Sequence, residues 1–354
     1  MPTIPEVGIP HVEVTTGNSP LDSGVRGNIV SVELNYEVDV PAMATITLNV
    51  WDPVARAVKD AYFDQFQLGT ALEVAIGLNQ TTPMFTGEVT ALEPSFGGHE
   101  GGGDTLRIQA YDRLHRLRFG TKQRTFQKQK DSEIASQIAD GVGLTGDVED
   151  TGVKHPHVTQ ENVNDLTFLL SRAKQINYEV RVEDKTLLFR KTREAEGPAI
   201  TLEYRKDLIR FSPRQRTVPE GGKVAVRGWD VKNKKVIVGT AGSGDESSKM
   251  GGSQTGAEVS SKAFVSSTRT ITDQPVLDTD EAQKIAKAWF NRQQQDFIEA
   301  DAESPGIPEL SAGKTIEIKG VGKPFSGVYY VVSATHTIGP EGYRTKFRVR
   351  RIAV

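Results

Sequence analysis

Near its C-terminal end the chain reads GKTIEI (313–318), FSGVYYVV (325–332) and YRTKFRVR (343–350). A closely similar sequence occurs early, as GTALEV (69–74), FTGEV (85–89) and LRIQ (106–109). In both copies a glycine opens the first strand-like stretch, and a Phe-Ser/Thr-Gly step begins the second. The repeated order indicates a duplicated β unit. We expect the repeat positions to be structural; they are Gly69, Phe85, Gly87, Gly313, Phe325 and Gly327.

The composition limits what kind of protein this is. The chain has 354 residues, a formal net charge of −3 at pH 7 and no cysteine. This length accommodates two or three domains with their own cores. The balanced charge provides no global field for nucleic acid or membranes, and the lack of cysteine excludes disulfides and thiolate sites and fits a reducing cytoplasm. We see no signal peptide and no run of about 20 apolar residues, so we expect no membrane partner.

In the first copy, residues 44–50 alternate apolar and polar side chains, which predicts a strand with one buried face. This strand runs into Trp51 and Asp52. Asp52 and the proline after it suit a helix start, so we expect a short amphipathic helix to about Phe66. Further strands and a glycine-rich hairpin loop are expected, at 71–76, 85–92, 106–111 and, for the loop, 97–104.

The second copy opens in the same way. A strand-like stretch ends on Trp229 as the earlier one ends on Trp51, and we interpret both tryptophans as repeat positions and core anchors. Residues 240–262 are rich in Gly and Ser, which predicts a flexible loop. A helix capped by Asp278 or Asp280 follows. It leads into the stretch from which this section began.

Between the two copies the pattern changes. Two amphipathic helices are expected, one beginning at 131–133 and one capped by Asn164, followed by a β-hairpin. We therefore interpret residues 121–205 as a small α+β unit. The expected organisation is mainly β, with one repeat unit at 1–120 and the other at 206–354.

Short motifs that resemble ligand-binding sequences stand in the wrong context. The glycines of 141–146 match a dinucleotide-binding pattern, but they close a helix instead of opening one, which favours a C-cap turn. Residues 312–315 resemble the end of a phosphate-binding loop, yet a strand follows and Pro308 stands where the first glycine belongs. His155 and His157 could ligate a metal, but the proline between them indicates an exposed loop.

We accordingly expect no catalytic residue, no cofactor and no metal site. Glu73 and Glu317 occupy equivalent strand positions, which duplication explains better than an acid/base pair does. No serine stands in a nucleophile elbow. The stretch 107–130 carries eight Lys and Arg and a single acid, a pattern that can bind nucleic acid. Because the whole chain has no net positive charge, we favour a solvated connector or a surface for an acidic protein, and we expect no nucleic-acid partner.

The order of several motifs resembles a known family. The motifs are FTGEVTAL (85–92), AYDRLHRLR (110–118), LTFLL (166–170), GWD (228–230) and GVGKPFSGVY (320–329). Each is weak alone, and together they extend over nearly the whole chain. On these residues the sequence resembles the phage late control protein D family, the baseplate hub of contractile tails. That family is similar to the N-terminal hub part of type VI secretion VgrG spike proteins.

The resemblance implies two tandem tail-tube-like β-barrels that flank the α+β unit, and a homotrimer. Three chains would present six similar barrels and so join a threefold spike to a sixfold tail tube. The sequence stops after the second barrel, so a separate spike protein is expected. Tail tube or tube-initiator proteins and baseplate wedge proteins are the other expected partners. The expected location is a virion tail baseplate or an injection particle, assembled in the bacterial cytoplasm.

The function expected from these points is structural, without enzyme activity. The alternative from another class is a tail-associated cell-wall hydrolase or a ligand-binding module. A nucleic-acid-binding protein that uses residues 107–130 is a third hypothesis.

Overall fold

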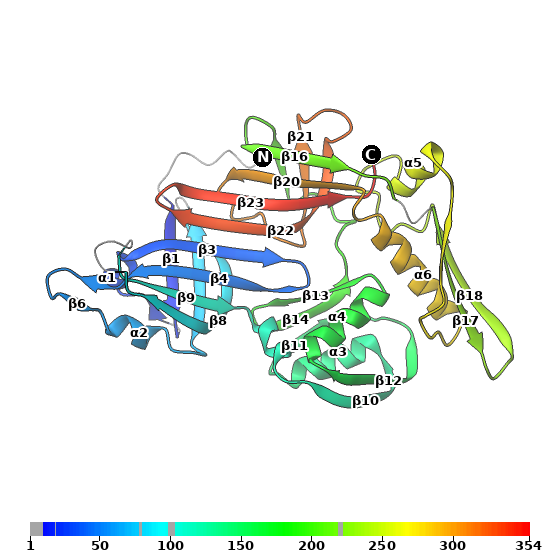
Figure 1. The fold of residues 1–354 in the computed structure, drawn as a ribbon, viewed down its shortest axis with the longest axis horizontal. Helices are drawn as coiled ribbons and strands as arrows, with labels where there is room; N and C mark the ends of the chain where they lie inside the picture. Colours follow the sequence, from blue (N-terminus) through cyan, green and yellow to red (C-terminus); the bar gives the residue numbers. More distant parts are fainter. Residues whose placement is uncertain (1–9, 18, 78–79, 98–102, 219–221) are drawn as a thin grey trace.

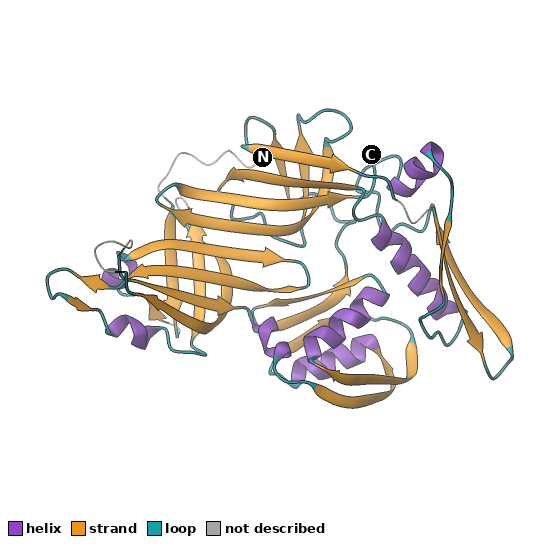
Figure 2. Cartoon of the chain, viewed as in Figure 1, coloured by secondary structure: helices purple, strands orange, loops and turns teal. Residues whose placement is uncertain are grey.

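The computed structural model describes residues 10–17, 19–77, 80–97, 103–218 and 222–354. The fold is mainly β, as the sequence predicts. One 13-stranded sheet runs through both ends of the chain (Figure 1). Most of the helical turns gather on one side, away from the stacked barrel strands (Figure 2). Most of the hairpin loop expected at 97–104 lies outside the described residues.

The first barrel is an antiparallel sheet with an apolar inner face. Its strands are hydrogen-bonded in the order β3-β4-β9-β8-β7-β1-β2. Alternate residues of β4 enter the core, where Ala44, Ile46 and Leu48 have no exposed surface, so the period-two pattern correctly predicted this strand. The bounds are β1 (His11–Thr16), β2 (Ser19–Pro20), β3 (Ile29–Glu37), β4 (Val40–Asn49), β7 (Ala71–Gly77), β8 (Thr82–Ser95) and β9 (Thr105–Tyr111).

The second barrel repeats this arrangement. Its strands are hydrogen-bonded in the order β16-β20-β23-β22-β21-β15. The first five are antiparallel and correspond one by one to β3-β4-β9-β8-β7, whereas β15 is parallel to β21. The bounds are β15 (Ile200–Glu203), β16 (Arg210–Gln215), β20 (Ile298–Pro305), β21 (Thr315–Lys319), β22 (Gly327–Gly339) and β23 (Gly342–Arg351).

The two barrels share strand register as well as strand order. One row of paired residues crosses four strands in each barrel, Leu34–Ala44–Ala110–Val89 in the first and Pro213–Ala300–Val349–Val331 in the second. Directly after this row both long strands contain one extra residue, a β-bulge, at Thr90 in β8 and at Val332 in β22. A bulge at the same place in both copies is strong evidence of duplication.

The turn before the repeat's first strand is also shared. The Gly69 N–H donates to the Val89 carbonyl at 2.8 Å, and the Gly313 N–H donates to the Val331 carbonyl at 2.9 Å. Both glycines adopt the left-handed region, with φ of 81° and 80°. A residue with a Cβ is strained there, which explains why glycine stands at both positions.

Two details of the expected repeat are wrong. The counterpart of β4 is β20, and the strand that ends at Trp229 lies in a separate sheet. The Phe-Ser/Thr-Gly steps are also out of register, because Phe85 lies opposite Val74 whereas Gly327 lies opposite Ile318. Phe85 is therefore equivalent to Gly327, and Phe325 precedes β22.

A second correction concerns the residues after β4. The helix expected to start after Asp52 is replaced by a small hairpin of β5 (Trp51–Asp52) and β6 (Ala57–Val58), followed by the short α2 (Ala61–Gln65). The Asp52 carboxylate accepts hydrogen bonds from the N–H groups of Val54 and Ala55, and so closes a turn. Another short helix, α1 (Ser23–Arg26), precedes β3.

The middle unit is α+β, with one core beneath its helices. The helix starts and the hairpin agree with the sequence interpretation. Asn164 caps α4 by accepting a hydrogen bond from the Thr167 N–H at 2.8 Å. The bounds are η2 (Arg113–Arg118, a 3₁₀ helix), β10 (Lys122–Lys130), α3 (Asp131–Asp140), β11 (Thr145–Val148), β12 (Lys154–Val163), α4 (Asp165–Gln175), β13 (Tyr178–Glu183) and β14 (Thr186–Lys191).

A further small unit is inserted between β16 and β20. Its sheet has the order β18-β17-β19, and a helix packs across one face of it with a separate apolar core. The helix is capped by Asp278, whose carboxylate accepts a hydrogen bond from the Glu281 N–H at 2.8 Å. The bounds are β17 (Lys223–Asp230), β18 (Lys235–Gly242), α5 (Gly256–Ala263), β19 (Thr268–Ile271) and α6 (Thr279–Gln293).

The loop expected at 240–262 is only partly present: residues 243–255 lie outside the helices and strands, but both ends of the range do not. Strand β18 extends to Gly242, and α5 begins within the same range. The Thr255 hydroxyl accepts a hydrogen bond from the Glu258 N–H at 3.3 Å, and the Glu258 carboxylate accepts one from the Thr255 N–H at 2.9 Å. This capping box starts a helix in spite of the Gly/Ser-rich composition.

Candidate assembly interface

The two barrels meet edge to edge, at a contact that we call the internal seam. The half of β22 beyond its bulge pairs antiparallel with β3, from Ser333 opposite Glu37 to Ile338 opposite Val32. Just outside this ladder, the Val38 N–H donates to the Val332 carbonyl at 3.0 Å. Continuous hydrogen bonding makes the two barrels one sheet.

Side chains reinforce the internal seam. The Thr335 hydroxyl donates to the Asn35 amide oxygen at 2.7 Å. Arg348 of β23 and Glu37 of β3 form an ion pair at 3.1 Å. Tyr343 of β23 packs into the first barrel's core. The seam therefore has polar, ionic and apolar components.

His336 is the buried polar residue at the centre of this seam. Its Nε2–H donates to the Leu310 carbonyl at 2.8 Å, and its Nδ1 accepts from the Tyr343 hydroxyl at 2.9 Å. The ring also packs edge-on against Tyr36, with centroids 5.8 Å apart. Burial lowers the pKa of His336 to about 4, because the charged imidazolium is poorly solvated there. His336 is neutral at pH 7, so it stabilises the internal seam through its hydrogen bonds and ring packing and not through charge.

The middle unit is attached to both barrels through buried polar contacts. Arg113 bridges Glu88 of the first barrel and Asp184 of the β13–β14 turn. On the second barrel, the Tyr330 hydroxyl donates to the Glu179 carboxylate at 2.7 Å. Leaving one partner of such a buried pair alone is costly, so these contacts hold the three units in a defined arrangement.

His155 links the middle unit to the inserted unit. Its Nε2 lies 3.1 Å from the Asp131 carboxylate and its Nδ1 lies 3.3 Å from the Glu281 carboxylate of α6. Hydrogen bonds to Asp131 and Glu281 raise the pKa of His155 to about 9. Arg172 completes the cluster with an ion pair to Asp131 at 2.6 Å. At neutral pH this charged cluster holds two units together.

The outcome for the histidine motif is mixed. His155 and His157 lie on strand β12, so the expected exposed loop is wrong. Pro156 is tolerated because β12 has only one partner strand, β10. Among the described residues no group of three or more His, Asp and Glu side chains could hold a metal ion. The buried cluster around His155 is an ion-pair network with Arg172 at its side.

The glycine motif at 141–146 follows the end of a helix and a strand follows the motif at 312–315, both as predicted. Helix α3 ends at Asp140, and Gly143 takes a left-handed φ of 73° in the turn that follows. Residues 312–315 lead into β21. Neither motif places N–H groups at the start of a helix, where a phosphate would bind.

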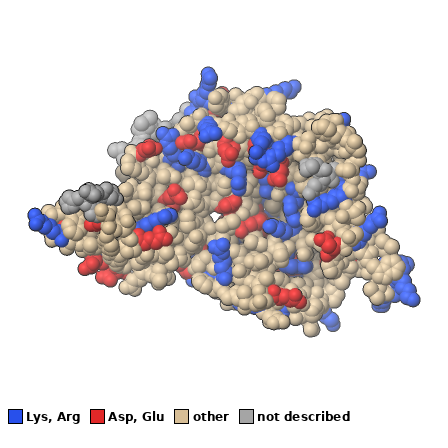
Figure 3. Space-filling model, viewed as in Figure 1, with Lys and Arg blue, Asp and Glu red and all other residues tan. Residues whose placement is uncertain are grey.

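Six of the eight basic residues in the stretch 107–130 form ion pairs within the chain. Glu88 accepts Arg113 and Arg116, and Asp165 accepts Lys122 and Arg124. The ends of the stretch pair as well, Arg107 with Glu93 and Lys130 with Asp150. The positive charges therefore stabilise the junction of the first barrel and the middle unit. On the face seen in Figure 3, basic and acidic side chains are interspersed over the barrels.

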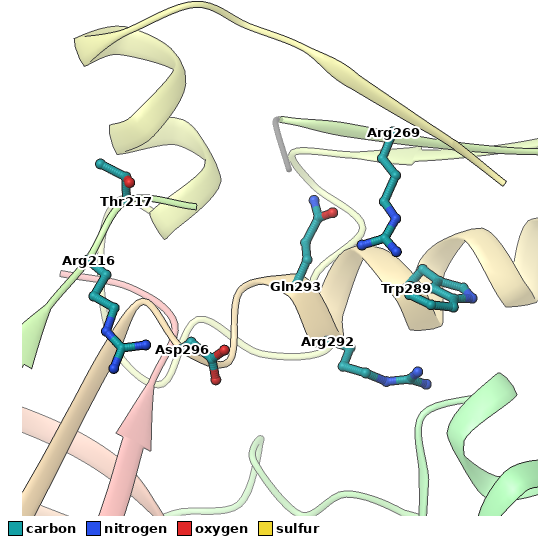
Figure 4. A pocket seen from close by; sticks show the side chains of 7 residues that line it. All are labelled: Arg216, Thr217, Arg269, Trp289, Arg292, Gln293 and Asp296. Atoms are coloured by element: carbon teal, nitrogen blue, oxygen red, sulfur yellow. The ribbon is translucent and has the colours of Figure 1, made fainter. Parts of the chain in front are cut away.

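An open cavity of about 640 Å³ lies between the second barrel and the inserted unit (Figure 4). Arg269 and Arg292 stack on the indole of Trp289, 4.5 and 5.1 Å from its centre. Burial lowers the pKa of Arg292. Arg216 and Asp296 complete the charged lining. Three guanidinium groups beside one carboxylate suit contact with an anionic group better than proton transfer.

The tryptophans that we expected to anchor cores are exposed. Trp51 is 36% exposed and Trp229 is 55% exposed. Trp229 lies opposite Val236 on the β17–β18 hairpin, where both side chains face away from the apolar core. By contrast, Trp289 packs against the core of the inserted unit. Sequence alone could not separate these cases, because both kinds of tryptophan adjoin apolar residues.

The fold is that of tail proteins. The 43 kDa tail protein of prophage MuSo2 from Shewanella oneidensis has a similar structure, with a TM-score of 0.71, 15% identity, and 97% of this chain and 98% of that chain covered. The tail protein from Neisseria meningitidis MC58 gives a TM-score of 0.69 at 11% identity, with 97% and 96% covered. An E. coli component of the type VI secretion system gives 0.60 at 12% identity, with 96% and 77% covered.

The chain belongs to the family described as the Alg8 N-terminal domain, whose sequence model matches residues 8–340. No curated protein sequence is a significant match. The similar structures of the tail proteins confirm the resemblance to baseplate hub proteins at the level of the fold. None of the helices in the described ranges is long and apolar enough to cross a membrane.

Proposed function

We propose that this chain is the structural hub of a contractile tail or a tail-like injection machine, without enzyme activity. The observation that carries the proposal is the pair of barrels with one strand order, one register and one shared bulge, joined edge to edge. A ring-forming protein uses each barrel as one repeat of the ring.

The proposed assembly is a homotrimer. Three chains contribute six similar barrels, so the ring is nearly sixfold in its barrels while the inserted and middle units keep it threefold. Such a ring joins a threefold spike on one face to a sixfold tail tube on the other. The E. coli protein with a similar fold is described as a type VI secretion component with structural similarity to the T4 tail proteins gp27 and gp5, which supports this role.

The proposed partners follow from this geometry. A separate spike protein binds one face of the trimer, tube or tube-initiator proteins bind the other, and baseplate wedge proteins surround it. The exposed apolar hairpin that carries Trp229 and Val236 offers contact area outside the barrels. The proposed location is the baseplate of a virion tail or of an injection particle assembled in the bacterial cytoplasm.

The oligomeric state tests the proposal. Light scattering coupled to gel filtration should give about three times the 38.7 kDa chain mass at micromolar concentration. Electron microscopy of the same sample should show rings with six similar lobes. A chain that remains monomeric, alone and with its spike, would refute the trimeric hub. Cleavage of purified peptidoglycan would instead favour the cell-wall hydrolase alternative.

A further inference from the structure

Each barrel has two edges that could form a seam, and the internal seam uses one from each. The edge of β3 is joined to β22. The equivalent edge of the second barrel, on β16, is unpaired because β16 ends the sheet. The stretch of β8 equivalent to the seam-forming half of β22 begins at Ala91, and β7 pairs only with earlier residues of β8. Among the described residues, these stretches of β8 and β16 have no partner strand on their outer side.

These two free edges cannot meet within one chain. Six strands lie between β8 and β16 in the sheet order. Their counterparts β22 and β3, however, are the two strands that pair in the internal seam. A second copy of the chain can therefore supply the missing strand in a head-to-tail contact.

We infer that residues 91–96 of one chain pair antiparallel with residues 211–216 of a neighbouring copy, in the register of the internal seam. This inference rests on the proposed function and specifies its chain-to-chain contact, which we call the external seam. Transferring the observed pairs from β22 and β3 to β8 and β16 gives the expected pairs Ala91–Arg216, Leu92–Gln215, Glu93–Arg214, Pro94–Pro213, Ser95–Ser212 and Phe96–Phe211.

The charges on these edges are complementary in this register. Within one chain Glu93 pairs with Arg107 of β9 at 3.7 Å, and Arg214 pairs with Glu299 of β20 at 3.5 Å. The external seam would place Glu93 directly beside Arg214. A row of alternating sign, Arg107–Glu93–Arg214–Glu299, then crosses four strands and two chains. Opposite charges across strands favour this register.

The exposed aromatic residue at the end of β8 is explained by the same contact. Phe96 is 60% exposed, whereas its counterpart Ile338 in the internal seam packs against the first barrel's core beside Val32. In the external seam the partner of Phe96 is Phe211, which already packs edge-on against Tyr329 with centroids 5.9 Å apart. Pairing would bury the Phe96 ring against an existing aromatic pair.

The prolines on the two edges interrupt the external seam at one pair, where neither chain can donate a main-chain hydrogen bond. Arg216 N–H donates to the Phe297 carbonyl, and the alternation of an antiparallel ladder then turns the Pro213 nitrogen outward. The Asp112 N–H donates to the Ala42 carbonyl of β4. When the same alternation is followed from this bond through β9 to β8, the nitrogen of Pro94 also points outward, away from β9. Edge prolines discourage pairing with arbitrary strands. Placed opposite each other, they leave the flanking pairs Leu92–Gln215 and Phe96–Phe211 free to form main-chain hydrogen bonds.

Disulfide trapping tests this register directly, because the natural chain has no cysteine. The double variant Ser95→Cys with Ser212→Cys places two exposed thiols opposite each other between chains, at a pair suited to a disulfide. After mild oxidation, non-reducing electrophoresis should show a covalent trimer and no larger species. The matched control is Ser95→Cys with Lys235→Cys, which places the second exposed thiol on the inserted unit and should remain monomeric on the gel.

A charge exchange provides the second test. Glu93→Arg should raise the concentration for half-dissociation of the trimer by about fivefold or more, as expected for an exposed ion pair replaced by repulsion. Glu93→Arg combined with Arg214→Glu should restore it. A trimer by light scattering that gives no trimer band from Ser95→Cys/Ser212→Cys overturns the external seam and leaves the hub proposal standing. A chain that never trimerises overturns the hub proposal itself.

Discussion

Protonation of His336 should weaken the internal seam. The imidazole is fully buried, and its two nitrogens already donate to Leu310 and accept from Tyr343. A second proton would remove the acceptor at Nδ1 and place a charge where water cannot reach it. His336→Gln keeps an amide donor at this place and cannot titrate, so it serves as the reference.

The size of the effect follows from the pKa of His336, about 4 in the folded protein against 6.5 for the free side chain. A folded pKa below the unfolded value means that the stability is present above pH 6.5 and is lost as the pH falls toward 4. Linkage gives a loss of about 2 kcal/mol between pH 7 and pH 5, and about 3 kcal/mol in all. This is a large part of a typical domain's stability.

Urea unfolding followed by circular dichroism at pH 7 and pH 5 measures this loss. Other groups titrate in the same range, among them Asp112, whose pKa burial raises to about 7. They titrate alike in both proteins, so the difference in unfolding free energy between the natural chain and His336→Gln isolates the histidine. That difference should shift by about 2 kcal/mol in favour of the variant at pH 5. A difference that does not change with pH would refute the reasoning.

Three other changes test separate parts of the structure. Gly69→Ala and Gly313→Ala should each lower the unfolding free energy by about 1–2 kcal/mol because both glycines have a left-handed φ; stability in urea equal to that of the natural chain would contradict this. Trp229→Ala should change the unfolding free energy by less than about 0.5 kcal/mol. Phe290→Ala, in the core of the same unit, should lower the unfolding free energy by about 3–5 kcal/mol. Stability contributed by His155 should be present below pH 6.5 and disappear as the pH rises through about 9, with a His155→Gln variant showing no such step in calorimetry.

The repeated strands could be predicted because their signals are local. The alternation at 44–50 specifies the conformation of a few neighbouring residues, and the structure has a strand there as expected. The helix caps Asn164 and Asp278 belong to the same kind. Signals of this length need no knowledge of distant partners.

Long-range pairing was beyond the sequence. The strand ending at Trp229 resembles β4 in its residues, yet it packs in one core with α6 and belongs to another sheet. Strand β20, the real counterpart of β4, reads IEADAESP and has small buried residues because large ones fill the core from elsewhere. His155 looked like part of an exposed loop because a proline follows it, and its partners Asp131 and Glu281 are far away in the sequence. The edges of β8 and β16 could only be recognised once the register of both barrels was known.

Because β3 and β22 are joined inside a single polypeptide, the number of barrels in an assembly is restricted. In the proposed ring, barrels would enter in covalent pairs, so rings of five or seven barrels would be excluded before any contact energy is considered. An assembly with the wrong number of barrels would have gained or lost a whole chain, that is, two barrels. The angle between neighbouring barrels would then change at every contact by much more than the loss of one barrel would require. The peptide bond thus acts as a check on stoichiometry, which six separate barrels would have to achieve through interface geometry alone.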